Sequence, residues 1–172
     1  MIVFDLETDG LLHDVTKIHC LVLYNTEDDT IHEYNDEGSN CEPLIRGLTI
    51  LDEADQIVGH NVINYDIPVI KKLYGFFDPQ GEVIDTLLLS RLYHPNMMDV
   101  DKRHEWKNMP LKLYGRHSLE SYGYRLGEYK GEYGKTTDWK EWSQEMQDYC
   151  RQDVKVTTKL CNHFRPYLNG SR

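Results

Sequence analysis

The sequence has no long hydrophobic run. Its longest apolar stretches, such as TLLLS at residues 86–90, are far shorter than the roughly 20 residues that a helix needs to cross a bilayer. The amino terminus, MIVFDLETDG, is acidic from its fifth residue, which is not typical of a secretory signal. We therefore predict neither a membrane span nor a signal peptide, and we expect no membrane partner.

Cysteine is scarce and widely spaced. The four cysteines stand at positions 20, 41, 150 and 161, so there is no CxxC pair and no spacing that suggests a disulfide framework. We expect reduced thiols and a cytoplasmic location.

Positive charge is also in short supply. The chain has 19 lysine and arginine residues against 29 aspartate and glutamate residues, a net charge of −10, whereas general nucleic-acid binders usually carry the opposite balance. Residues 1–101 contain 5 basic and 20 acidic residues, but residues 102–135 contain 8 and 4, together with one tryptophan and five tyrosines. Two interpretations of this basic segment remain open: a surface that meets phosphates and stacks bases, or a solvated face with tyrosines used in packing.

The length and the hydrophobic pattern predict one α/β domain over residues 1–172. A three-strand meander is expected first, followed by alternating helices and strands, which together make a mixed central sheet flanked by helices. The interval 95–115 shows no sustained period and is predicted to be a long loop. The expected strands are 1–9, 17–25, 30–35, 57–60 and 82–85, and the expected helices are 43–54, 66–74, 86–93, one that begins at Ser118 and one that begins at Ser143.

Two acidic residues interrupt the first apolar strand. Asp5 and Glu7 are two residues apart, so both side chains lie on the same face of that strand. Carboxylates held this close repel each other, and a bound divalent cation removes that cost. The alternative is a strand end exposed to water, where the acids are harmless.

Three further acidic positions stand next to predicted helices. Asp66, the last residue of GHNVINYD, begins a predicted helix and is either a helix-terminal residue or a site residue. Asp85 is predicted to cap the helix that follows it. Tyr149 and Asp153 are four residues apart on the core-facing side of the last predicted helix. They are either site residues or a structural pair joined by a hydrogen bond.

Eight histidines raise the alternative of a zinc site, but no HExxH motif occurs and the histidine spacings fall on unrelated segments. We expect His60 to hydrogen-bond its loop and not to hold a metal ion.

Three motifs form an ordered series: DLE on the first strand, HNxxxYD opening a helix, and YxxxD on the last helix. With them the sequence resembles the DEDDy branch of 3′–5′ exonucleases, which have an RNase H-like fold, and most closely the proofreading domains of podovirus family A DNA polymerases. The segments HSLESYGYRLGEYKGEYG and EMQDYCRQDVKVT are similar to that subfamily, so the resemblance extends over nearly the whole chain.

The resemblance implies two-metal-ion hydrolysis of a phosphodiester, with two Mg²⁺ or Mn²⁺ ions as cofactors. It implies that Asp5, Glu7, Asp66 and Asp153 bind the ions and that Tyr149 orients the attacking water. The expected substrate is a single-stranded or frayed DNA 3′ end, with RNA as the less favoured choice, and a viral source would place the protein in the host cytoplasm. Substrate contacts are expected at Leu6, Thr8, His60, Asn61, Lys112 and Arg116.

Two questions stay open at this point. The chain is either a free-standing nuclease or the proofreading part of a DNA polymerase, which is then its partner. A domain of the same fold could also be non-catalytic and hold nucleic acid or a polymerase. The residues expected to contact the nucleic-acid backbone are Lys102, Arg103, Lys107, Lys112, Arg116 and Lys130.

Overall fold

The computed structural model describes residues 1–38, 40–128 and 138–170. Five strands form one sheet in the order β3-β2-β1-β4-β5. The strands are β1 (Ile2–Thr8), β2 (Ile18–Asn25), β3 (Thr30–Tyr34), β4 (Gln56–Gly59) and β5 (Glu82–Asp85). The helices are α1 (Leu44–Glu53), α2 (Ile67–Leu73), α3 (Thr86–Tyr93), α4 (Met97–His104), α5 (Leu119–Arg125) and α7 (Gln144–Leu168). Two short helical segments accompany them, the π-helix η1 (Val62–Asp66) and the 3₁₀-helix η2 (Leu111–Leu113).

The strand pairing confirms the predicted meander and mixed sheet. β1 pairs antiparallel with β2, and β2 pairs antiparallel with β3. On its other side β1 pairs parallel with β4, and β4 pairs parallel with β5. β1 is therefore the central strand, and its side chains are covered on both faces.

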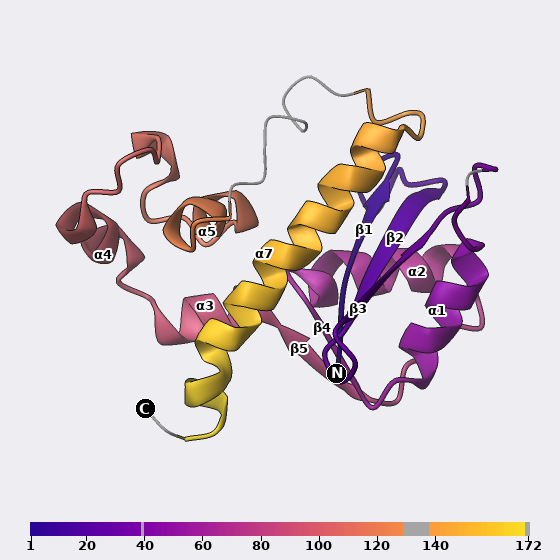
Figure 1. Ribbon diagram of the computed structural model, residues 1–172, viewed down its shortest axis with the longest axis horizontal. Coiled ribbons are helices and arrows are strands. Elements are labelled where there is room, and N and C mark those ends of the chain that lie inside the picture. Colours follow the sequence, from indigo (N-terminus) through magenta and orange to yellow (C-terminus); the bar gives the residue numbers. More distant parts are fainter. Residues whose placement is uncertain (39, 129–137, 171–172) are drawn as a thin grey trace.

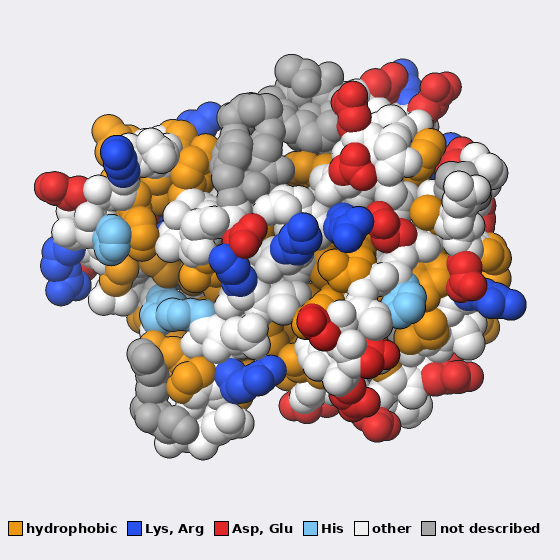
Figure 2. All heavy atoms as spheres, in the orientation of Figure 1, with side chains coloured by type: hydrophobic (Ala, Val, Ile, Leu, Met, Phe, Trp, Pro, Cys, Tyr) orange, Lys and Arg blue, Asp and Glu red, His pale blue; other side chains and the backbone are white. Residues whose placement is uncertain are grey.

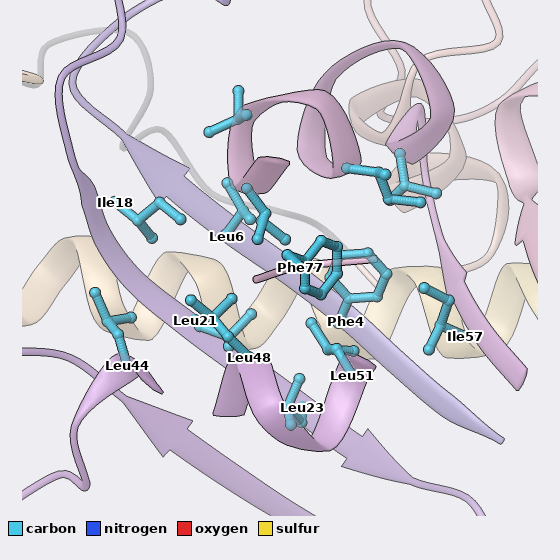
Figure 3. Close-up of a cluster of buried hydrophobic side chains, with 14 of the residues drawn as sticks. Phe4, Leu6, Ile18, Leu21, Leu23, Leu44, Leu48, Leu51, Ile57 and Phe77 are labelled. Carbon is cyan, nitrogen blue, oxygen red and sulfur yellow. The ribbon is translucent and has the colours of Figure 1, made fainter. Parts of the chain in front are cut away.

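Alternation along β1 divides the core into two layers. Phe4 and Leu6 point to the face covered by α1 and α2, where Leu48 and Leu51 of α1 pack on them (Figure 3). Val3 points to the opposite face, which the long helix α7 crosses (Figure 1). A fully buried leucine or phenylalanine stabilises the fold by about 2–3 kcal/mol, so this alternation fixes the register of β1.

Helices α3, α4 and α5 lie on the other side of α7 from α1 and α2 (Figure 1). The prediction of a loop over residues 95–115 is wrong, because this interval contains α4 and η2. Only Met97 and Asp101 of α4 are buried, so the helix has too few apolar positions to show a period. The contacts that hold α4 come from residues distant in the sequence.

The carboxylate of Asp101 makes several polar contacts of α4, and Met97 packs in an apolar cluster with residues of α5 and α7. The Asp101 carboxylate is fully buried and accepts hydrogen bonds from Arg125 Nε at 2.9 Å, Arg125 Nη2 at 2.6 Å, Trp106 Nε1 at 2.9 Å and the Gly115 N–H at 2.8 Å. Burial by itself would raise the pKa of this carboxyl, but the hydrogen bonds and the charge of Arg125 outweigh burial and hold the pKa below 3.8. One side chain thus joins α4, α5 and the segment between them.

Asp101→Asn is expected to lower the free energy of unfolding at neutral pH by about 3 kcal/mol, because Arg125 would stay buried without its counter-charge. The folded-state pKa is lowered, so this contribution is complete above the unfolded pKa and is lost as pH falls through the folded pKa. Urea unfolding followed by circular dichroism measures it. Asp99→Asn, an exposed acid on the same helix, should change stability by less than about 0.5 kcal/mol. Equal stability of wild type and Asp101→Asn at pH 7 would contradict the assignment.

The surface reflects the uneven charge of the sequence. On the face drawn in Figure 2, acidic side chains concentrate on the side of the sheet and α1, whereas lysine and arginine side chains extend across the middle and towards α3–α5. Of the residues expected to contact the nucleic-acid backbone, Lys130 lies outside the described residues. Within the part of the chain that the structure describes, no helix has both the length and the apolar character to span a membrane.

Candidate active-site cleft

The β1 carboxylates lie on the α7 face of the sheet. Asp5 pairs with Val22 in the antiparallel register and Glu7 pairs with Cys20, and both acids are partly buried. They therefore do not occupy a freely exposed strand end. The register shifts between Glu7 and Thr8, an irregularity of the kind that redirects side chains near active sites.

Helix α7 brings Asp153 to the same place. Ser143 caps the helix as predicted, its Oγ accepting a hydrogen bond from the Met146 N–H at 3.1 Å. Met146, Cys150 and Asp153 are buried on the face towards the sheet, whereas Tyr149 is only partly buried. Because α7 packs directly on β1, a carboxylate on its buried face must lie close to the acids of that strand.

Asp66 ends the π-helix η1 and precedes α2. The helix-cap alternative is wrong, because Asp66 has helical backbone angles and its side chain makes no capping hydrogen bond. The residue is 5% exposed, and its Oδ2 has no hydrogen-bond partner among the described residues. Burial raises the pKa of this carboxyl well above 3.8, and the charges of Asp85 and Asp153 raise it further. A proton or a bound cation would offset the cost of burying this carboxylate.

Asp85 positions the loop that leads into η1. Its carboxylate accepts from the Leu87 N–H at 2.9 Å, which confirms the predicted cap of α3, and also from the Asn61 N–H at 2.9 Å and the Ile63 N–H at 3.1 Å. Gly59 allows the loop to turn so closely, since a Cβ there would lie 2.1 Å from Val62 Cγ1. Asn61 adopts the left-handed conformation, φ 63°.

Tyr65 joins η1 to the end of β1. Its hydroxyl contacts Thr8 Oγ1 and donates to the Gly10 carbonyl. The prediction assigned no role to Tyr65, although it precedes Asp66 in the HNxxxYD motif. This link and the Asp85 contacts hold the segment that carries Asp66 at both ends.

A cleft of about 530 Å³ opens between these elements and the α3–α5 side of the molecule. Asp5 and Asp153 face it, together with His60, Asn61 and Arg116 from the set of expected substrate contacts. Sequence reasoning missed Arg91, His117 and three neutral lining residues. Polar side chains that face a cleft do not contribute to the hydrophobic periodicity of the sequence, so the periodicity does not indicate them. The neutral lining residues are Leu87, Ser118 and Leu119.

His117 is held by a buried hydrogen-bond chain. Its Nδ1 lies 2.5 Å from Ser90 Oγ, which lies 2.5 Å from the Tyr122 hydroxyl. Burial lowers the pKa of His117 below 6.5, and the charges of Arg125 and Arg91 lower it further. The imidazole therefore lines the cleft in its neutral form at pH 7, with Arg91 and Arg116 as the cationic groups.

The remaining predicted residues divide between a second hollow and the outer surface. Glu7 and Thr8 line a hollow of about 480 Å³ with Leu11, Tyr65 and Trp139. Leu6 borders this hollow as well, but its side chain is 4% exposed and packs in the core.

His60, which lines the cleft, forms a hydrogen bond between its Nδ1 and Thr86 Oγ1 at 2.8 Å. The exposed Lys112 is not among the described lining residues, although its carbonyl accepts from Arg116 Nε at 2.9 Å.

A sequence profile described as RNase_H superfamily matches residues 2–165. The chain belongs to the RNase_H superfamily. Among curated proteins it is similar to the DNA-directed DNA polymerases of Enterobacteria phage T3 and Escherichia phage T7, with 38% and 37% identity over 93% of this chain. The chain spans about a quarter of the length of these relatives, 26% in each case.

Solved structures of low sequence identity share the fold of this RNase_H superfamily domain. Brucella melitensis NrnC with bound Mg²⁺ has a TM-score of 0.62 and 21% identity, and the match covers 98% of this chain and 74% of that one. Escherichia coli RNase D, an exoribonuclease, has a TM-score of 0.57 and 16% identity over 96% and 41% of the two chains. The chain therefore has an RNase H-like fold, and the predicted fold class is confirmed.

The donor set of this RNase H-like domain fits divalent cations. Asp5, Glu7, Asp66 and Asp153 provide hard carboxylate oxygens, which Mg²⁺ and Mn²⁺ prefer. The buried Asp66 Oδ2, which lacks a hydrogen-bond partner in the described residues, is the kind of atom that such a cation would satisfy.

Proposed function

We propose that this domain, residues 1–172, is a 3′–5′ exonuclease that releases nucleoside monophosphates from single-stranded or frayed DNA 3′ ends. The observation that carries the proposal is the convergence of carboxylates from three elements. Asp5 of β1 and Asp153 of α7 face one cleft, and the charge of Asp153 acts on the buried Asp66 of η1. A fold keeps such mutual repulsion when a bound cation offsets it.

The proposed cofactors are two divalent cations, Mg²⁺ or Mn²⁺. Asp5, Glu7, Asp66 and Asp153 would hold these ions. When bound, the ions supply an activated water and stabilise the entering and leaving oxygens of the phosphodiester. The protein would provide the carboxylates that hold the ions.

Other side chains of the cleft would bind and orient the substrate. Arg91 and Arg116 are cations that line the same cleft as Asp5 and Asp153, where they can contact phosphate oxygens. His60 and Asn61 line the same cleft, and Thr8 and Leu6 border the adjoining hollow. Tyr149 lies one helical turn before Asp153, from where its hydroxyl would orient the attacking water. Lys112 would contact the backbone of the strand outside the cleft.

Tyr149→Phe is expected to reduce the single-turnover rate by about tenfold to a hundredfold, because the orienting hydroxyl is lost while all four carboxylates remain. Rapid-quench digestion of a labelled oligonucleotide at saturating enzyme measures this rate. Tyr167→Phe, farther along the same helix, is the matched control and should keep the wild-type rate. An unchanged rate in Tyr149→Phe would assign that residue to packing alone.

The decisive test of the function is digestion of a 5′-labelled single-stranded oligonucleotide with Mg²⁺ or Mn²⁺. We expect a ladder that shortens from the 3′ end, mononucleotide products and complete arrest by a chelator. An RNA strand of the same sequence, digested in parallel, measures sugar preference, and we expect slower digestion. Binding of the strand without cleavage under any divalent cation would favour the non-catalytic alternative.

The similarity to phage polymerases suggests the setting of the reaction. We propose that the domain removes nucleotides at a primer terminus in the host cytoplasm, with a DNA polymerase in the same or another chain as its partner. Stimulation of excision at a mismatched terminus by the partner polymerase would test this.

A further inference from the structure

A histidine and a tryptophan stack on each other at the carboxyl end of α4. The ring centroids of His104 and Trp106 lie 3.4 Å apart, and the two ring planes differ by 10°. Glu105, between them, adopts the left-handed conformation at φ 53°, so the chain turns and the tryptophan folds back against the histidine. A glutamate in this conformation is strained, and such strain concentrates at functional positions. The turn builds a flat pair of rings, His104 and Trp106, which we call the stacking platform.

The stacking platform is held in place by the buried Asp101. Trp106 Nε1 donates to Asp101 Oδ1 at 2.9 Å, and the same carboxylate is bound by Arg125. The Trp106 side chain is half-buried, whereas His104 is exposed. Since Trp106 covers one face of the imidazole, the exposed part of His104 is its edge and its other face. A planar ring that is fixed in position and open to solvent on one face can stack a further ring.

The stacking platform adjoins the lining of the cleft. The Asp101 carboxylate that accepts the Trp106 Nε1–H also accepts the Gly115 N–H at 2.8 Å, so both groups meet on one side chain. Arg116, the next residue along the chain, lines the cleft that the site carboxylates face. A strand whose 3′ end enters the cleft would therefore have its preceding nucleotides near the platform.

Positive charge surrounds the stacking platform. Lys102, Arg103 and Lys107 are exposed, and Glu105 is the one acid in residues 102–107. Figure 2 shows lysine and arginine side chains at this outer end of the molecule, near α4 (Figure 1). Single-stranded nucleic acids bind surfaces that combine basic side chains for the phosphates with aromatic rings for the bases. A double strand does not suit the platform, because its bases are already stacked on one another.

We propose that the stacking platform, with Lys102, Arg103 and Lys107, binds single-stranded nucleic acid upstream of the 3′ end and stacks one base on His104. The position of the 3′ end rests on the proposed function, but binding to the platform does not require cleavage. Stacking tolerates every sequence, because each base has a π-face. Affinity should therefore rise once a strand is long enough to extend from the cleft to the platform.

The test is binding of single-stranded DNA that carries one 2-aminopurine, in the presence of a chelator so that no strand is cleaved. The fluorescence of 2-aminopurine falls when the base stacks, and the probe is placed at each position of the strand in turn. We expect the strongest quenching at one or two internal positions. His104→Ala should abolish that maximum and weaken binding by at least about fivefold, whereas His104→Phe, which keeps a flat ring, should retain both. His32→Ala, an exposed histidine of β3, is the matched control and should leave both unchanged.

Salt dependence separates base stacking from phosphate contacts. Each phosphate contact contributes about −0.7 to the slope of log affinity against log salt concentration for a single strand. Lys102→Ala and Lys107→Ala should each make this slope shallower by about that amount, whereas His104→Ala should lower the affinity at an unchanged slope. Lys71→Ala, an exposed lysine of α2, is the basic control and should change neither.

Three outcomes would overturn the stacking platform: no quenching at an internal position in wild type, unchanged quenching in His104→Ala, or the same loss in His104→Phe as in His104→Ala. The exonuclease proposal fails separately. Internal quenching in a protein that digests nothing with Mg²⁺ or Mn²⁺ would refute the exonuclease and support the platform. Digestion without internal quenching would refute the platform and leave the exonuclease standing.

Discussion

Asp153→Ala is expected to lower the rate of mononucleotide release by at least about 10³-fold, and Asp5→Ala by as much. Each change removes a carboxylate from the pair that faces the cleft, and with it a ligand for the cations that the reaction needs. Single-turnover digestion of a labelled single strand, at saturating Mg²⁺ and enzyme, measures the loss without contributions from product release.

The same substitutions should leave a folded protein. Asp153 raises the pKa of the buried Asp66, and Asp5 lies beside Glu7 on one face of β1, so removal of either charge relieves an unfavourable interaction. The midpoint of thermal unfolding without metal should therefore be equal to or above that of wild type. Asp148→Ala is the matched control, because this acid lies on the exposed side of the same helix and should retain full activity. A normal rate in folded Asp5→Ala or Asp153→Ala, with cation binding intact, would reject the metal assignment.

A single strand is expected to be digested faster than a matched blunt duplex by about 30-fold to 10⁴-fold. The 3′-terminal phosphodiester must reach carboxylates on a central strand and on the buried face of α7, which a paired and stacked end does not do without fraying. Fraying costs about 1–2 kcal/mol per base-pair step, and each 1.4 kcal/mol slows the reaction about tenfold, so two or three frayed pairs account for this range.

Initial rates on a single strand, a 3′-mismatched duplex and a matched duplex, under one salt condition, test this expectation. The mismatched end should be intermediate, because part of the fraying cost is already met. Binding should weaken with salt to the same degree for every sequence, since the proposed contacts go to phosphates. Equal rates on matched duplex and single strand would contradict the prediction that the duplex end must fray first. That result would indicate an element that separates the strands, for which residues 95–115 are the first candidates.

Local patterns in the sequence were sufficient for most of the fold. Apolar runs bounded by turn-like acidic and asparagine clusters predicted β1, β2 and β3, and the cap residues Asp85, Ser118 and Ser143 marked the starts of three helices that the structure contains. Helix α4 was missed because Asp101, its main anchor, is a buried acid whose partner Arg125 stands 24 residues away. No local rule connects those two positions.

The π-helix η1 was missed for a related reason. Nothing in VINYD distinguishes a π-turn from the first turn of α2, and the distinction depends on Asp85 and Tyr65, which hold the segment from β5 and β1. This geometry, and not helix capping, explains why Asp66 is buried beside Asp153.

The sequence by itself determined where the strands and most of the helices lie along the chain, because apolar runs, turn residues and cap residues are local properties. Only the tertiary structure decided what shares a space with the four carboxylates of the candidate site. Arg91 and His117 line the cleft, and Cys150 lies against Asp5, because α7 packs on β1 while α3 and α5 pack on α7. Contacts between residues more than a hundred positions apart depend on that packing, and no spacing along the chain encodes them.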